Sequence, residues 1–163
     1  SGGNSLANIA AANGIDQISG FGSTDTLNVA ALGDTNANTA VATIVTAAAA
    51  KRTMTNNRME IITTTGTAAD ITTSGNATLA VADYTAGTLT NLAAFLNEGF
   101  QAAVGADTES GGFIINDANT NLSYVYAFDN STAAKTIIAA ELGLVGVIDN
   151  GGTDLTAAQI LFA

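Results

Sequence analysis

The residues of this chain whose type could do chemistry are its carboxylates, and the chemistry open to them is calcium binding. The chain has 163 residues, with 14 aspartates and glutamates against 4 lysines and arginines, and it contains no histidine or cysteine. Calcium prefers oxygen ligands of this kind. Ordinary solvated turn aspartates are the alternative at each position taken singly. We expect any metal ligands among five aspartates: Asp16, Asp25, Asp117, Asp129 and Asp149.

Asp16 is the best placed of the five because it lies in a nine-residue pattern. Two units follow one another, Gly2–Ala10 and Ala11–Ser19, and each matches half of the form G-G-x-G-x-D-x-U-x, where U is a large apolar residue. The first unit has Ala7 at the aspartate position, so a site shared between the units would lack one carboxylate. We interpret both units as degenerate last turns of a parallel β-roll. The matching residues are Gly2, Gly3 and Ile9 in the first unit and Gly14, Asp16 and Ile18 in the second.

A second calcium pattern begins at Asp117 and is incomplete. The stretch Asp117–Asn121 has the D-x-N-x-N opening of an EF-hand loop. Leu122 stands where that loop needs glycine, and Phe128 stands where it needs a bidentate glutamate. We therefore favour a plain turn at this position.

The segment that follows the repeats carries a family resemblance. Gly14–Phe21 leads into Asp25–Leu32, and this order resembles the segment that closes the calcium-binding roll in RTX proteins exported by type I secretion. The end of the chain, Leu155–Ala163, resembles the tails of type I secretion substrates. Asp83–Glu98 and Glu141–Val147 look like the end of large repetitive bacterial surface proteins. The resemblance implies an extracellular, calcium-dependent structural protein of S-layer-like or adhesin-like type.

The composition excludes several classes of function. Hydrolases of the usual serine, cysteine and zinc types need histidine or cysteine, so we expect no enzyme. A net charge of -10 disfavours binding to nucleic acid or to an anionic membrane surface. No stretch approaches 18 apolar residues, so we expect no membrane insertion. No ordinary signal peptide is visible, and because the chain begins inside a repeat we expect a fragment or a processed product.

The first half of the chain gives mixed signals for secondary structure. Thr39–Arg52 has helical spacing of apolar residues but also alternating β-branched residues, and we expect a helix there. Arg58–Thr64 and Thr78–Asp83 are expected to be strands. The clearest helix is Leu89–Val104, with one apolar stripe, Thr88 as a cap and Gly105 at its end.

The second half is expected to be β. Phe113–Ile115 leads through a turn at Asp117–Asn121 into Leu122–Asp129, whose side chains alternate between two faces with a period of two, and this order predicts a hairpin. Glu141–Asp149 and Gln159–Phe162 predict two further strands. The predicted fold is mainly β, with remnant β-roll turns in residues 1–33 that lead into a sheet or sandwich with one packed amphipathic helix in residues 34–163.

These expectations lead to a structural function. We expect a self-assembling extracellular subunit of a surface layer, filament or biofilm matrix, secreted by a type I system and ordered by calcium, with other copies of itself as partner. The alternative is a C-terminal folding and secretion cap of a larger RTX adhesin or exported enzyme.

Overall fold

The computed structural model describes most of the chain. The described residues are 16–29, 40–44, 51–54, 58–63, 68–70, 78–80, 89–102, 110–117, 120–130, 132 and 134–161. At residues 16, 40–44, 68–70 and 78–80 the description covers the backbone alone. The fold is mainly β with one helix packed on a sheet, which confirms the fold class expected from the sequence.

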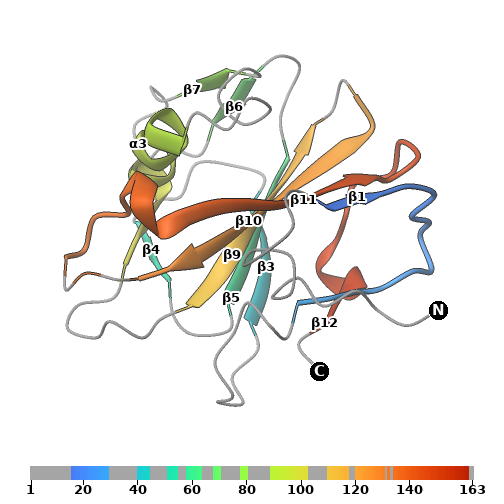
Figure 1. Cartoon of the computed structure of the whole chain (residues 1–163), viewed down its shortest axis with the longest axis horizontal. Coiled ribbons are helices and arrows are strands. Elements are labelled where there is room, and N and C mark those ends of the chain that lie inside the picture. The colour runs from blue at the N-terminus through green and yellow to red at the C-terminus, as the bar shows by residue number, and fades with distance from the viewer. Residues whose placement is uncertain are drawn as a thin grey trace.

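A six-stranded sheet forms the centre of the molecule (Figure 1). β9 and β10 pair antiparallel as the predicted hairpin, and every other pairing in the sheet except β10 with β11 is parallel. β10 is therefore the one strand of this sheet that runs against the others. The strands in spatial order are β1 (Asp16–Ile18), β11 (Leu142–Asp149), β10 (Leu122–Asp129), β9 (Ser110–Asp117), β5 (Arg58–Thr63) and β3 (Ala40–Ile44).

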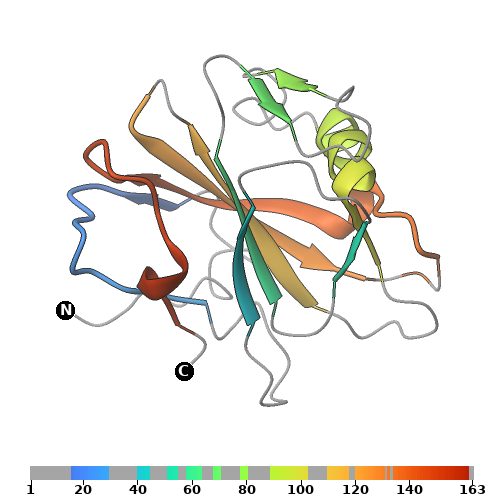
Figure 2. The ribbon, with the colours of Figure 1, turned by 180° about the vertical axis from the view of Figure 1, so that it is seen from behind.

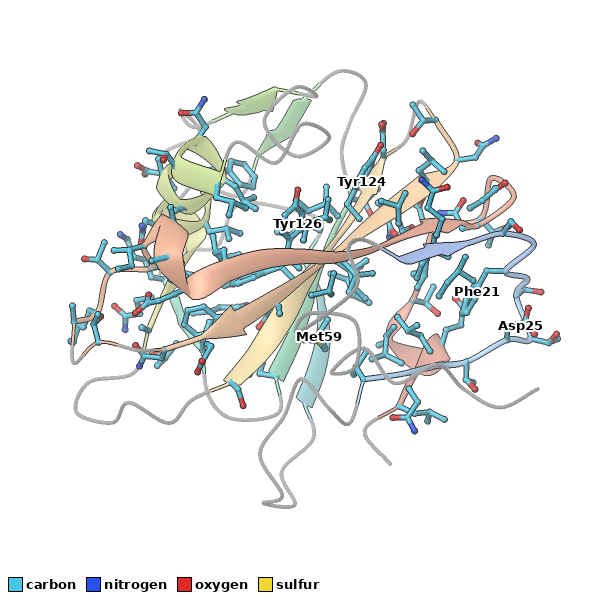
Figure 3. All side chains as sticks on the ribbon, in the orientation of Figure 1. Phe21, Asp25, Met59, Tyr124 and Tyr126 are labelled. Carbon is cyan, nitrogen blue, oxygen red and sulfur yellow. The ribbon has the colours of Figure 1, made fainter. Side chains whose placement is uncertain are left out.

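Alternation along the strands builds a separate core on each face of the sheet. Tyr124 and Tyr126 of β10 pack on one face, whereas Met59 of β5 packs on the other (Figure 3). The first face lies under helix α3 (Leu89–Gly99), so we call its cluster the α3 core. The second face is covered by the two terminal parts of the described chain, so we call its cluster the terminal core.

A β-bulge lets β11 contribute to both cores. The register between β10 and β11 shifts between Val125 and Tyr126. Leu144 packs toward the α3 core before the shift, Val145 packs in the terminal core, and Val147 packs toward the α3 core again. An extra residue in one strand exchanges the faces of all residues that follow. The bulge therefore explains why even-numbered residues face α3 in one half of β11 and odd-numbered residues in the other.

Helix α3 is shorter than the apolar stripe predicted. The expected helix ran to Val104, but α3 ends at Gly99 and Phe100–Gln101 forms strand β8. β8 pairs in parallel with β4 (Arg52–Thr53), and Phe100 is fully buried in the α3 core. Glycine is a poor helix former, so the strand pairing and the burial of Phe100 outweigh one more helical turn. The last expected helical residues, 103 and 104, lie outside the described residues.

The helix expected at Thr39–Arg52 is wrong. Ala40–Ile44 forms strand β3 beside β5, and Arg52 begins β4. The alternation of β-branched residues, including Val41 and Thr43, decided the structure here because such side chains favour strands. Residues 45–50 lie outside the described residues.

The remaining strand predictions largely agree with the structure. Arg58–Thr63 is β5, Leu142–Asp149 is β11, and the end of the chain contributes β12 (Ile160–Leu161). Thr78–Ala80 is β7 and pairs antiparallel with β6 (Ala68–Asp70), while residues 81–83 lie outside the described residues. Two short 3-10 turns, η2 (Ala139–Glu141) and η3 (Ala157–Gln159), precede β11 and β12.

The terminal parts of the described chain lie together on the face away from α3. Figure 2 shows this arrangement from behind, with β12 and η3 on the opposite side of the sheet from α3. β2 (Leu27–Asn28) pairs with β12 in a separate two-stranded sheet, and η3 lies close to β3. Residues 16–29 thus share the terminal core with later strands, and the division of the chain at residue 33 stays a prediction.

Candidate functional site

Two segments from opposite ends of the chain lie side by side in parallel. We call residues 16–29 the N-terminal segment and residues 146–161 the C-terminal segment. β1 pairs with β11, with Ile18 opposite Ile148, and β2 pairs with β12, with Leu27 opposite Ile160. The N–H of Phe21 donates to the carbonyl of Asp149 at 3.2 Å between the two pairs. The two segments therefore lie beside each other along two strands and along the turn that connects those strands.

The turn in the N-terminal segment is built from local hydrogen bonds. Gly20 has a φ of +72°, a conformation that glycine adopts without steric cost. The N–H of Gly22 donates to Oδ2 of Asp25 at 2.8 Å, and the N–H of Asp25 donates to the carbonyl of Gly22 at 3.0 Å. Phe21 and Asp25 thus lie in one turn, the first buried and the second exposed (Figure 3). Asp25 closes this turn.

The spacing of the two N-terminal strands was present in the sequence but was not recognised. Asp16 and Asp25 are nine residues apart, as are Ile18 of β1 and Leu27 of β2. Residues 20–28 therefore form a third nine-residue unit after the two that the glycines indicated. The strands of two successive units, β1 and β2, lie in different sheets. A repeat of nine residues that contributes one strand for each unit would produce this arrangement.

The predicted metal ligands whose side chains are described mostly serve their own turns. Asp149 Oδ1 accepts from the N–H of Gly151 at 3.1 Å, and Asp117 Oδ2 accepts from Oγ1 of Thr120 at 2.8 Å. Asp25 accepts from Gly22, as described above. Asp129 is exposed at the end of β10. For Asp16 the structure gives the backbone, which pairs with Gly146.

Three of the predicted ligands lie apart from one another in the central sheet. Asp117 and Asp129 lie at opposite ends of the β9–β10 hairpin. Asp117 and Asp149 are each opposite Leu122, from the two neighbouring strands, which places them about 10 Å apart by ordinary strand spacing. One calcium ion needs its oxygen ligands at about 2.3–2.6 Å. Within the described part of the chain no group of three carboxylates is found, and calcium binding at these residues stays a prediction.

A buried carboxylate that the sequence reasoning missed lies on β5. Glu60 is fully buried, on the same face of β5 as Ile62. Its Oε2 lies 3.0 Å from Nη1 of Arg52, and its Oε1 accepts from Nε of Arg58. Burial raises the pKa of Glu60 above its ordinary value of 4.5, while the charges of Arg58 and Arg52 act in the opposite direction. Two of the four basic residues of the chain thus neutralise one buried acid.

A buried polar network on the other face connects the sheet to the C-terminal segment. Asn116 of β9 is fully buried, and its carboxamide meets both backbone groups of Leu155: Nδ2 donates to the carbonyl at 3.0 Å, and Oδ1 accepts from the N–H at 3.2 Å. Ser123 Oγ donates to the same Oδ1 at 2.7 Å and accepts from Nδ2 of Asn150 at 2.8 Å. The N–H of Gly152 donates to Oδ1 of Asn150 at 3.1 Å.

The side chains of this network hold the backbone of the C-terminal segment in place and do not present reactive groups. The asparagine side chains accept and donate as a neighbouring strand would, and each atom described above has a protein partner. Part of the sequence signal was available: Ser123 lies between Leu122 and Tyr124, and Asn116 directly follows the apolar run Phe113–Ile115. Such residues are normally paired when buried.

Comparison with known proteins gave no relative. No protein-family model, no curated protein sequence and no solved structure matches the chain. Among the residues that the structure describes, no helix combines the length and the apolar composition needed to cross a membrane. The paired terminal segments are therefore the candidate functional site, on the strength of their own geometry.

Proposed function

We propose that this chain is a non-catalytic module that closes a stacked β structure in an extracellular protein. This is the cap function that the sequence offered as an alternative. The observation that carries it is the parallel pairing of the N-terminal segment with the C-terminal segment, through β1 with β11 and β2 with β12. One layer of a parallel stack thus rests on a closing layer supplied by the end of the same chain.

In the described part of the chain, no strand pairs with the other side of the N-terminal segment. β1 is the terminal strand of the six-stranded sheet, and β2 pairs only with β12 among the strands that the structure describes. Both outer edges therefore carry backbone donors and acceptors that suit a further parallel strand. The nine-residue spacing of Ile18 and Leu27 favours a preceding layer with the same repeat.

The self-assembling subunit expected from the sequence is the second candidate. The outer edge of β1 supports it too, because sheet edges are normally protected by proline, lysine or a covering element. The chain has no proline, and no lysine precedes Lys51. In this version the strand that pairs with β1 comes from another copy of the chain.

Secretion by a type I system and ordering by calcium belong to the proposal through the sequence resemblance. The described carboxylates give no chelating group, so calcium is proposed from the repeat pattern at Asp16 alone. A non-catalytic role agrees with Glu60 and Asn116, two of the buried polar residues of the sheet, which bond to arginines and to backbone.

A fusion experiment tests the cap function. Nine-residue repeats of the form G-G-x-G-x-D-x-U-x are placed before residue 1, and their β content in calcium is followed by circular dichroism with and without the module. We expect the repeats to order only when the module is attached. A Leu27→Asp module, which places a charge in the terminal core, should not support them, and repeats that order equally well alone would contradict the proposal.

A second experiment separates the self-assembling subunit from the cap. The purified chain is examined by electron microscopy and by light scattering in calcium-containing solution. A polymer that is lost on deletion of Ser1–Ala12, while the monomer stays folded, supports self-assembly through the N-terminal edge. A stable monomer in all conditions supports the cap.

A further inference from the structure

The two faces of the central sheet depend on different parts of the chain. The α3 core draws its residues from β4 to β11 and contains none from residues 16–29 or 150–161. The terminal core contains Phe21, Leu27 and Val29 from the N-terminal segment and Leu155 and Ile160 from the C-terminal segment. Loss of residues 16–29 and 150–161 would therefore uncover one face of the sheet and leave the other face packed.

The N-terminal segment is held largely by the C-terminal segment. Among the described strands β2 pairs with β12 alone, and the N–H of Val29 donates to the carbonyl of Leu161 at 2.7 Å. Gln159 Nε2 donates to the carbonyl of Gly22 at 3.2 Å. Leu27 and Val29 are 3% and 0% exposed, and Ile160 beside them is 5% exposed. If residues 150–161 moved away, β2 would lose its strand partner.

Residues 150–161 are in turn held on the sheet by hydrogen bonds as well as by the burial of Leu155 and Ile160, and the N–H of Asn150 donates to the carbonyl of Asn121 at 3.0 Å. Asn116 holds both backbone groups of Leu155, and Ser123 holds the side chain of Asn150. The connection to β11 passes through Gly151 and Gly152, whose φ values are +62° and +87°. A pair of glycines in this region of φ is a turn that can change its backbone angles at low steric cost.

We propose that residues 16–29 and 150–161 open and close as one unit, with Asn116 as the clamp that holds the unit shut. When residues 150–161 are seated, β1 and β2 are ordered and their outer edges are available for a neighbouring strand. When the clamp releases, residues 16–29 and 150–161 leave the sheet together, with β1 separating from β11, while α3 and the β9–β10 hairpin stay folded. Proteins open in such cooperative units, each with its own free energy. This inference does not depend on the proposed function.

Hydrogen exchange of the full chain tests the inference with a matched pair of variants. Asn116→Asp keeps the shape of the side chain but removes the Nδ2 donor, so that a carboxylate oxygen faces the carbonyl of Leu155. Asn97→Asp is the control on the other face, because Asn97 Nδ2 donates to the carbonyl of Ile137 and its Oδ1 accepts from the N–H of Ile137. Both substitutions add one negative charge and remove one donor.

We expect Asn116→Asp to raise the rate of amide exchange in residues 16–29 and in residues 150–161 by about tenfold or more. The two factors should be similar. The exchange rates in α3 and in β9 should change by less than about twofold. Asn97→Asp should raise exchange in α3 and around Ile137 and leave residues 16–29 unchanged. Faster exchange at 150–161 with unchanged exchange at 16–29, or a uniform increase throughout the chain, would overturn the inference.

The wild-type chain provides a second measurement that does not depend on either variant folding. In low concentrations of urea, amides of β2 and β12 should exchange through one shared opening, with the same dependence on urea. Amides of Phe113 and Tyr126, on the hairpin, should exchange only through a larger opening. Separate urea dependences for β2 and β12 would contradict a single unit.

Discussion

Asn97 holds Ile137 by both of its backbone groups, and Asn116 holds Leu155 in the same way on the opposite face of the sheet. The carboxamide of Asn97 accepts from the N–H of Ile137 at 2.9 Å and donates to its carbonyl at 2.6 Å. Each held residue is buried, at 1% exposure, and lies in a stretch between strands. In both places a side-chain amide makes the two hydrogen bonds that a neighbouring strand would make, and irregular backbone can therefore enter a core.

Removal of the Asn97 side chain should destabilise the fold through unpaired backbone. In Asn97→Ala the N–H and the carbonyl of Ile137 lose their partner inside the α3 core, and each buried unpaired group costs about 1–3 kcal/mol. We expect the unfolding free energy in urea to fall by about 2–4 kcal/mol. Thr90→Ala, on the exposed side of the same helix, is the control and should change it by less than about 0.5 kcal/mol.

Two glycines of β9 are required by close backbone approach. A Cβ at Gly112 would lie 2.4 Å from the carbonyl oxygen of Tyr126 and 2.8 Å from Sδ of Met59. A Cβ at Gly111 would lie 2.3 Å from the carbonyl oxygen of Arg58. Alanine at either position should lower the unfolding free energy by about 3 kcal/mol because the strands must separate.

Gly143 provides the matched control for those two substitutions. It lies in β11 of the same sheet, and a Cβ built on it meets no atom within 4 Å. Gly143→Ala should be neutral or slightly stabilising, because alanine loses less conformational entropy on folding than glycine does. Equal losses at positions 112 and 143 in urea titrations would show that glycine is not required by the spacing of the strands.

Glu60 should make stability depend on pH in a direction unusual for a carboxylate paired with arginine. Because burial raises the pKa of Glu60 above 4.5, the folded state binds this proton more tightly than the unfolded state does. The resulting contribution to stability is full below pH 4.5 and is lost as the pH rises through the folded-state pKa. We therefore expect the unfolding free energy of the wild type to fall relative to that of Glu60→Gln across this interval.

Substitution of Arg58 should widen the pH interval over which the chain loses unfolding free energy relative to Glu60→Gln. The charge of Arg58 is the largest influence that lowers the pKa of Glu60, and in Arg58→Met the pKa should rise further. Urea titrations at closely spaced pH values would then show the loss of stability continuing to higher pH than in the wild type. Curves for the wild type and Glu60→Gln that run parallel at every pH would refute the assignment.

Calcium should raise the melting temperature if the repeat at Asp16 binds it. Sites on extracellular modules bind at about 10^-4 to 10^-3 M, and tenfold excess over Kd adds about 1.4 kcal/mol a site. We expect higher melting in millimolar calcium than in chelator, with magnesium a poor substitute because it demands a tighter shell. Asp16→Ala should remove part of the difference, and identical melting in all three solutions would exclude calcium ordering.

The strand pattern of the second half was predictable from local sequence. Tyr124 and Tyr126 alternate with Val125 and Ala127 at a period of two, and the structure places the two pairs in different cores. The apolar stripe of α3 was equally clear in the sequence, but the residue at which the helix ends was not. Phe100 fits the helical spacing, and only its pairing with Arg52, some fifty residues earlier, makes it a strand.

The parts that escaped prediction depend on pairings between distant residues. The parallel partners of β1 and β2 lie about 130 residues later in the chain, and no local pattern specifies them. The same holds for one of the two ion pairs of Glu60, because Arg52 belongs to another strand. Asn116 was visible as a polar residue at the end of an apolar run, but its partner Leu155 lies 39 residues away.

The direction of the terminal pairings decides how the module responds to force. β1 runs parallel to β11, and β2 runs parallel to β12. Tension applied through the two ends of the polypeptide pulls the N-terminal segment one way and the C-terminal segment the other way along the same strand axis. The hydrogen bonds between them, including that of Val29 with Leu161, are then strained together in shear, whereas an antiparallel pair pulled from its open end would separate bond by bond. Tension along the chain would therefore load the hydrogen bonds between the two terminal segments together instead of one after another.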